Sequence, residues 1–211
     1  MVKIEKYQND GWGLSKKCFL DIFNIIKSLK STTINVVEFG SGISTEFFVD
    51  LISDGYDVHI TSFDNDEQFA TKIRHNNLNL HITDLIECYD SDFDKLFQQK
   101  IFDRRMFFKK ISPVNTRQTS TFYDVSEEQL PKVINVMVVD GPHGNGRSIA
   151  FLLGKNRLLS GSFVVIDDYN HYDFVNKFQI IFPESSLVFE STSDLENKWE
   201  SGGNYVIYRI D

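Results

Sequence analysis

The sequence predicts an α/β fold in which a largely parallel β-sheet carries helices on both faces. Short apolar runs alternate along the chain with segments whose apolar side chains recur at helical spacing. Strands that are separated by helices pair in parallel through right-handed crossovers. With 211 residues, of which 41% are hydrophobic, the chain can bury the core of one such domain. We therefore expect a single domain over residues 1–211.

The spacing of apolar residues places each element along the chain. Apolar runs predict strands at 34–39, 57–63, 78–83, 133–140 and 162–167. Helical spacing predicts helices at 14–29, 45–52, 67–75 and 147–159, the first within an N-terminal helical segment over 1–30. Two last runs, 185–191 and 204–210, are joined by a polar, glycine-containing segment, so we expect an antiparallel pair at one edge of the sheet.

Residues 84–131 interrupt this alternation and are expected to form an insertion or lid. The stretch is too long for an ordinary connection, and such excursions usually carry function or disorder. Within it, residues 100–110, KIFDRRMFFKK, interleave basic with aromatic side chains. A helix with one core face and one solvated basic face is the favoured interpretation. The alternative is a lid or platform over an anionic or sugar-like substrate.

Charge and cysteine content narrow the class of protein. A formal net charge of −8 disfavours a broad grip on a nucleic-acid backbone, which needs clustered Lys and Arg. Cys18 and Cys88 lie far apart without a CxxC or Cys/His cluster, so we expect two reduced thiols. The N-terminus has no apolar signal core, and no apolar run approaches membrane-spanning length. These features favour a cytoplasmic chain, or a domain cut from one.

The most informative stretch is residues 36–45, VVEFGSGIST. A buried strand ends in glycines and is followed at once by a helical pattern, so backbone amides and the helix dipole point toward a ligand. The candidate cofactor-binding residues here are Glu38, Gly40, Ser41, Gly42, Ser44 and Thr45. An acid after the second strand suits a carboxylate that binds both ribose hydroxyls, which singles out Asp64 with its neighbour Asn65. Asp84, after the third strand, is a candidate for the adenine amino group.

The same stretch favours S-adenosylmethionine over a dinucleotide as the cofactor. Thr45 occupies the third glycine position of the dinucleotide fingerprint, and Glu38 would repel a pyrophosphate. A cationic sulfonium with an ammonium group would be attracted by that carboxylate. An NAD-dependent oxidoreductase is further disfavoured because no Tyr-x-x-x-Lys or similar catalytic pair is found.

Acids also follow the fourth and fifth strands. If those strands are neighbours, Asp140, Asp167 and Asp168 meet at one edge of the sheet. Hard carboxylate oxygens suit Mg²⁺ or Ca²⁺. A structural or hydrogen-bonded role for the three acids is the alternative.

Five motifs in order carry a resemblance to a known family. They read EFGSGIST, SFDNDEQF, FYD, VVDGPHGNGR and GSFVVIDDYN. This series resembles the class I S-adenosylmethionine-dependent methyltransferases, and it implies their Rossmann-like, seven-stranded, mostly parallel sheet with an antiparallel last strand. Within that class it is similar to an EFGSGxST / VDGPxG / DD subgroup, in which Phe122 stands where Trp is common. The acid pattern resembles metal-dependent sugar O-methyltransferases, and DGPxG…GR is similar to polysaccharide methyltransferases that act on uronic acids.

The resemblance implies a role for each acceptor-side residue. Asp140, Asp167 and Asp168 would hold Mg²⁺, or Mn²⁺ or Ca²⁺, against two vicinal sugar hydroxyls. A sugar hydroxyl must lose its proton during methyl transfer, and His143 is the expected general base, with Asp140 as substitute. The alternative is that His143 caps a helix or faces solvent. Weaker acceptor candidates are Asn170, His171, Trp12 and Tyr123.

The sequence thus predicts an S-adenosylmethionine-dependent O-methyltransferase that acts on a sugar hydroxyl of a glycan or glycoconjugate, with a divalent metal. The alternatives are methylation of another small molecule or of a protein, and a non-catalytic S-adenosylmethionine-binding module. No N/D-P-P-Y/F motif for a flipped base is found, so no nucleic-acid partner is expected, and no membrane partner either. A fusion to, or action with, a glycosyltransferase is a further hypothesis.

Overall fold

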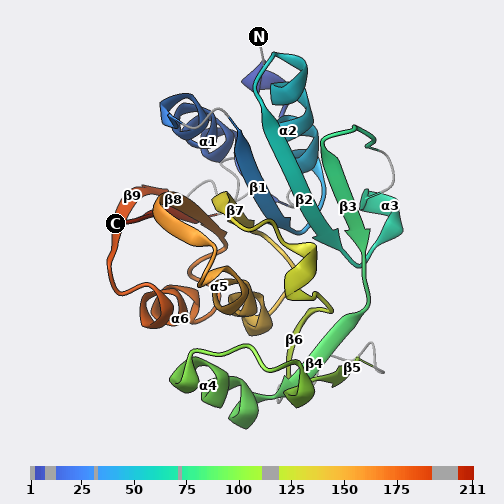
Figure 1. Ribbon diagram of the computed structural model, residues 1–211, viewed down its shortest axis with the longest axis vertical. Helices are drawn as coiled ribbons and strands as arrows, with labels where there is room; N and C mark the ends of the chain where they lie inside the picture. Colours follow the sequence, from blue (N-terminus) through green and yellow to red (C-terminus); the bar gives the residue numbers. More distant parts are fainter. Residues whose placement is uncertain (1–2, 8–12, 31–32, 71–72, 111–118, 192–203) are drawn as a thin grey trace, which may run out of the picture.

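The computed structural model describes residues 3–7, 13–30, 33–70, 73–110, 119–191 and 204–211 (Figure 1). A seven-stranded sheet has the order β3-β2-β1-β7-β8-β10-β9. Its strands are β1 (Ile34–Phe39), β2 (Val58–Asp64), β3 (Leu78–Ile82), β7 (Ile134–Val139), β8 (Leu158–Asp167), β9 (Ser185–Ser191) and β10 (Tyr205–Ile210). The first five strands in that order are parallel, while β10 is antiparallel to both β8 and β9. The predicted fold class and the predicted antiparallel edge pair are therefore confirmed.

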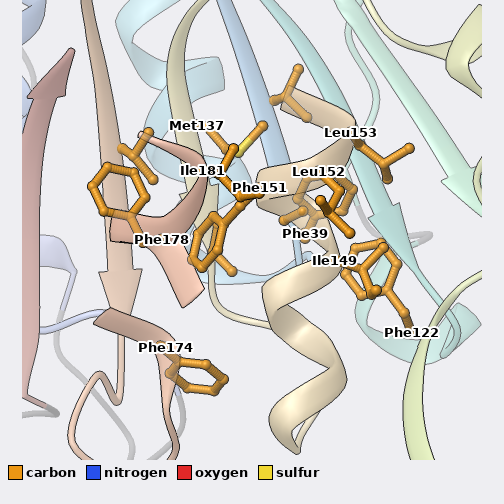
Figure 2. Packing of buried hydrophobic residues seen from close by; sticks show 14 of the residues in the cluster. Phe39, Phe122, Met137, Ile149, Phe151, Leu152, Leu153, Phe174, Phe178 and Ile181 are labelled. Atoms are coloured by element: carbon orange, nitrogen blue, oxygen red, sulfur yellow. The ribbon is translucent and has the colours of Figure 1, made fainter. Parts of the chain in front are cut away.

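Two helical layers cover the sheet, one on each face (Figure 1). One layer contains α1 (Lys16–Ser28) and α2 (Ile43–Ser53), and the other contains α5 (Ile149–Gly154) and α6 (Phe174–Ile181). Side chains alternate between the faces of a strand, so Val36 packs in the α1/α2 core while Val37 and Phe39 pack in the other. Figure 2 shows part of this second core, to which Phe39 and side chains of α5 and α6 belong.

Residues of the predicted insertion form a small second sheet beyond the carboxyl ends of β1 and β2 (Figure 1). Its antiparallel strands are β4 (Leu85–Tyr89), β5 (Phe108–Lys109) and β6 (Thr119–Tyr123), in the order β5-β4-β6, and α4 (Asp90–Gln99) follows β4. Phe122 of β6 packs against Phe39 of β1, with ring centroids 5.2 Å apart. The small sheet thus shares the core of the large one and is held close to the ends of its strands.

The predicted helix over 100–110 is wrong. Lys100 ends α4 in a left-handed conformation, with φ of 55°. The chain then forms only a 3₁₀ turn, η2 (Arg104–Met106), before β5. Arg104 donates two hydrogen bonds, of 2.6 and 2.9 Å, to the carboxylate of Asp124 at the end of β6. Arg104 thus connects this extended segment to the residue that follows β6, across the small sheet.

Two predicted helices end earlier than expected. The helix α3 (Glu67–Ala70) is short, and residues 73–75 are not helical. The predicted helix 147–159 is instead the 3₁₀ turn η4 (Asn145–Ser148) followed by α5, and β8 already begins at Leu158. Gly154, the last residue of α5, packs closely on the sheet, because a Cβ there would lie 2.6 Å from Met137 Cε and 2.9 Å from Leu158 Cδ1.

Two short 3₁₀ turns complete the fold, η1 (Ile4–Lys6) and η3 (Glu127–Gln129). In the part of the chain that the structure describes, no helix combines the length and the apolar character needed to cross a bilayer.

Candidate active site

The carboxylate of Glu38 is fully buried at the end of β1. Its Oε2 accepts hydrogen bonds from Thr45 Oγ1, at 2.6 Å, and from Ser62 Oγ, at 2.7 Å. Its Oε1 is buried and has no hydrogen-bond partner among the described residues. Burial raises the pKa of Glu38 to about 7, against the opposing effect of these hydroxyl donors. A free acceptor atom at this place can take a hydrogen bond from a cationic ligand.

The glycine turn lies in direct contact with the loop that follows β7. Gly40 has φ of 102°, and a Cβ there would lie 2.9 Å from the amide nitrogen of Gly141. A Cβ on Gly141 would lie 2.4 Å from the hydroxyl of Tyr123 and 3.0 Å from the Cα of Gly40. Gly42, by contrast, has no atom within 4 Å of such a Cβ. The first glycine is thus required by packing, and Gly42 faces open space where a ligand can approach the backbone.

Asp64 ends β2 beside the same turn. Its Oδ2 accepts the amide of Ser41 at 2.7 Å, and its Oδ1 accepts the amide of Asp66 at 2.8 Å. The Ser41 hydroxyl lies 2.8 Å from Ser62 Oγ, which links this acid to the Glu38 network. Asp64 is 7% exposed, and burial raises its pKa. The acid predicted to bind ribose therefore lies next to the glycine turn, although its ribose contact stays a prediction.

Asp140, Asp167 and Asp168 form a cluster at the ends of β7 and β8. Asp167 is 2% exposed, and its pKa is raised well above the usual range by burial and by the two neighbouring carboxyls. Its side chain shares a hydrogen bond with that of Asp140, whose pKa is also raised by burial. Asp168 is partly exposed and has a left-handed backbone, with φ of 53°. The predicted meeting of these acids at neighbouring strand ends is therefore found.

A buried cation lies among the three acids. Arg147 of η4 is 4% exposed, and its Nη1 lies 4.0 Å from Asp168 Oδ2. Among the described residues, no three His, Cys, Asp or Glu side chains are arranged so that they could hold a metal ion. Coordination of a metal by Asp140, Asp167 and Asp168 stays a prediction.

His143 is exposed in the loop between β7 and η4. Its Nε2 lies 2.9 Å from the hydroxyl of Tyr172, and the two rings meet edge to face with centroids 5.6 Å apart. His171 and Asn170 are exposed in the loop after β8, and the amide of His171 donates to the Asp168 carbonyl at 2.9 Å. These side chains are open to a large acceptor. Their roles stay predictions.

The remaining candidates differ in their surroundings. Ser44 is buried in the first turn of α2, and Asn65 is exposed after β2. Asp84 is exposed and forms an ion pair with Lys109 of the small sheet at 2.6 Å, and its contact with the adenine amino group stays a prediction. Trp12 lies outside the described residues.

Sequence reasoning missed Ser62 and gave Arg147 no role, and it named Tyr123 only as a weaker acceptor candidate. Ser62 is an ordinary strand residue until its contact with Glu38 is seen. Tyr123 is 2% exposed, and its hydroxyl lies 2.4 Å from the place that a Cβ on Gly141 would take. The available signal for Arg147 was its place at the end of the VVDGPHGNGR motif, two residues before the apolar run 149–153.

The fold and this site define a class of protein. A buried acid before a glycine turn, a second acid after β2 and a sheet with one antiparallel strand near its edge are the features of a class I S-adenosylmethionine-dependent methyltransferase. A family model described as a methyltransferase domain matches residues 37–169. The chain therefore belongs to this methyltransferase family, and it is an S-adenosylmethionine-dependent methyltransferase.

Solved structures show the same fold at low sequence identity. A precorrin-6y C5,15-methyltransferase from Geobacter metallireducens is 11% identical, with a TM-score of 0.53 over 97% of this chain and 93% of that one. The O-methyltransferase TomG from Streptomyces achromogenes, in complex with S-adenosylmethionine, is 9% identical, with a TM-score of 0.54 over 98% and 85%. A probable spermidine synthase from Corynebacterium glutamicum is 10% identical, with a TM-score of 0.53 over 92% and 62%. Curated protein sequences give no significant match.

Proposed function

We propose that the protein transfers a methyl group from S-adenosylmethionine to a sugar hydroxyl of a glycan or glycoconjugate. The observation that carries this proposal is the exposed pair of His143 and Tyr172, which lie in the loops that follow β7 and β8. A sugar needs a base for its hydroxyl and an aromatic face for its ring, and this pair offers both at a place open to solvent. The O-methyltransferase TomG has the same fold, which is compatible with this reaction type.

The residues fit S-adenosylmethionine by their charge. Glu38 offers a buried acceptor atom without a partner among the described residues, and Gly42 has open space at its Cα. Acidic side chains end β1 and β2 and follow β7, and in their ionised form they would attract a cationic ligand. When bound, the cofactor supplies an electrophilic methyl group on its sulfonium sulfur.

His143 acts in this proposal as the general base. We place its ring hydrogen on Nε2, donated to the Tyr172 hydroxyl, so that Nδ1 is free to accept a proton. The acceptor hydroxyl gives its proton to Nδ1 while its oxygen forms the new bond to the methyl carbon. The electron pair of the broken carbon–sulfur bond stays on sulfur. The products are a methyl ether, the neutral thioether and a protonated imidazole.

A divalent metal has no step in this mechanism. Arg147 is buried beside Asp168, and its guanidinium already supplies positive charge where a metal would be expected. A divalent ion among these carboxyls would face that cation at close range, so the residues present fit a metal poorly.

The test is methyl transfer from labelled S-adenosylmethionine to a panel of neutral sugars and uronic acids, read by mass spectrometry. We expect an O-methyl product, with turnover reduced by about 10²–10⁴-fold in His143→Ala because a general base contributes that much. His59→Ala, an exposed histidine of β2 whose Nε2 lies 3.1 Å from Asp57 Oδ1, is the matched control and should retain far more activity. Product formation on proteins or other small molecules alone would refute the sugar acceptor, and full turnover of His143→Ala would refute the base.

A further inference from the structure

The guanidinium of Arg147 is buried inside an acidic cluster rather than exposed at its surface. Arg147 lies in η4, and only 4% of the residue is exposed. An ionised group in such a position is stable only if acceptors and opposite charge surround it. The groups around Arg147 therefore show which negative charges its guanidinium neutralises.

Four contacts fix this guanidinium. Nε donates to the Pro142 carbonyl at 3.2 Å, and Nη1 donates to the Asp167 carbonyl at 3.1 Å. Nη1 also lies 4.0 Å from Asp168 Oδ2. The guanidinium carbon lies 5.4 Å from the ring centroid of Phe174. The side chain thus joins the loop after β7 to the end of β8 and to the start of α6.

The charge of Arg147 acts on the buried carboxyls as well. It lowers the pKa of Asp140 and of Asp167, in opposition to the burial that raises both. Ionised carboxylates without any cation would repel one another here, and the neighbouring carboxyls already contribute to the raised pKa of Asp167. Arg147 contacts the cluster at Asp168 Oδ2 and at the Asp167 carbonyl, and the exposed ring of His171 lies 3.6 Å from Asp168 Oδ1.

We propose that Arg147 is the resident cation of this acid cluster and a positioning residue of the active site, so that the native protein holds Asp140, Asp167 and Asp168 together without a divalent metal. The inference rests on the proposed function for the place of the acceptor, which would bind beside this cluster. Arg147 then supplies the positive charge between the acids that the sequence predicted for a metal ion. The cluster then keeps its shape in a medium free of divalent ions.

The first experiment measures the melting temperature of the wild-type protein in EDTA and after addition of Mg²⁺, Mn²⁺ or Ca²⁺. We expect no change, because Arg147 already occupies the place of the cation. A metal that bound the native cluster would raise the melting temperature by about 5–10 °C at a concentration about 100 times its dissociation constant. Loss of stability in EDTA that is restored by one of these ions would overturn the proposal.

The second experiment asks whether Arg147 acts through its charge. We expect Arg147→Met to lower the melting temperature by about 6–15 °C, because the buried carboxyls lose their counter-charge. Adding Asp168→Asn should restore at least half of that loss, because it removes one negative charge and Asn tolerates a left-handed backbone. A purely structural role would not be relieved by this second change.

Matched variants keep this second experiment decisive. Arg157 is another largely buried arginine that donates to two carbonyls, those of Pro131 and Glu127, at 3.0 and 2.9 Å. Arg157→Met should be destabilised without any relief from Asp168→Asn. If Arg147→Met does not fold, Arg147→Lys keeps the charge and should fold and remain insensitive to divalent ions. The proposal would be contradicted if Asp168→Asn restored the stability of both arginine variants equally. It would also be contradicted if Arg147→Lys needed a divalent ion in order to fold. These melting data do not involve an acceptor, so failure of sugar methylation leaves them unchanged.

Discussion

The contact between the glycine turn and the loop after β7 makes Gly141 the position where a single methyl group should be most informative. A Cβ at Gly141 would lie 2.4 Å from the Tyr123 hydroxyl and 3.0 Å from the Cα of Gly40. Neither distance is tolerated without movement, and Gly40 belongs to the predicted cofactor turn. Overpacking of this kind costs about 1–3 kcal/mol. For a chain of this size, we expect Gly141→Ala to lower the melting temperature by about 2–10 °C.

The Tyr123 hydroxyl is the closest of these atoms, so Tyr123→Phe should relieve the clash. Urea unfolding of wild type, both single variants and the double variant gives a coupling free energy, which we expect to be at least about 1 kcal/mol in favour of the double variant. Gly42→Ala is the control, because its Cβ would meet no atom within 4 Å. It should change stability by less than about 0.5 kcal/mol. If Gly141→Ala is as stable as wild type, or Tyr123→Phe restores nothing, the close approach does not exist.

Two further predictions concern the buried carboxylate. The folded pKa of Glu38, about 7, lies above its unfolded value of 4.5, so its contribution to stability is complete below pH 4.5 and is lost as the pH rises through 7. That loss is about 3 kcal/mol. Glu38→Gln should therefore flatten the dependence of the unfolding free energy on pH between pH 5 and 8, measured by urea unfolding of the ligand-free protein. An unchanged dependence on pH would refute this. Thr45→Val removes the 2.6 Å donor to Glu38 and the acceptor of the Gly42 amide, so it should cost about 1–3 kcal/mol in the same assay. Thr45→Ser should restore most of this, and a neutral Thr45→Val would contradict the network.

The central strands of the large sheet, such as β1 and β7, could be predicted because each is a short apolar run buried between the two helical layers, and the largely exposed edge strand β9 was found by its alternation with a polar segment. The predicted ranges 34–39 and 185–191 agree with β1 and β9 at both ends. The segment 100–110 could not be predicted in this way. Its aromatic side chains suggested a helical face, but the pairing of Arg104 with Asp124 depends on a strand that follows later in the chain. Local spacing does not contain that information.

The positions of the acids in the site could be predicted from the sequence, but their different environments could not. Sequence spacing placed Asp167 and Asp168 together and treated them alike as metal ligands. In the fold, β8 ends at Asp167, which is buried and holds its proton more tightly, while Asp168 follows the strand in a left-handed conformation and is partly exposed. Burial thus separates the chemistry of the two acids, and the charge of Arg147 opposes its effect on Asp167. An acid motif alone therefore predicts where negative charge gathers, but the choice between a metal ion and Arg147 as its counter-charge depends on which cation the fold can bury there.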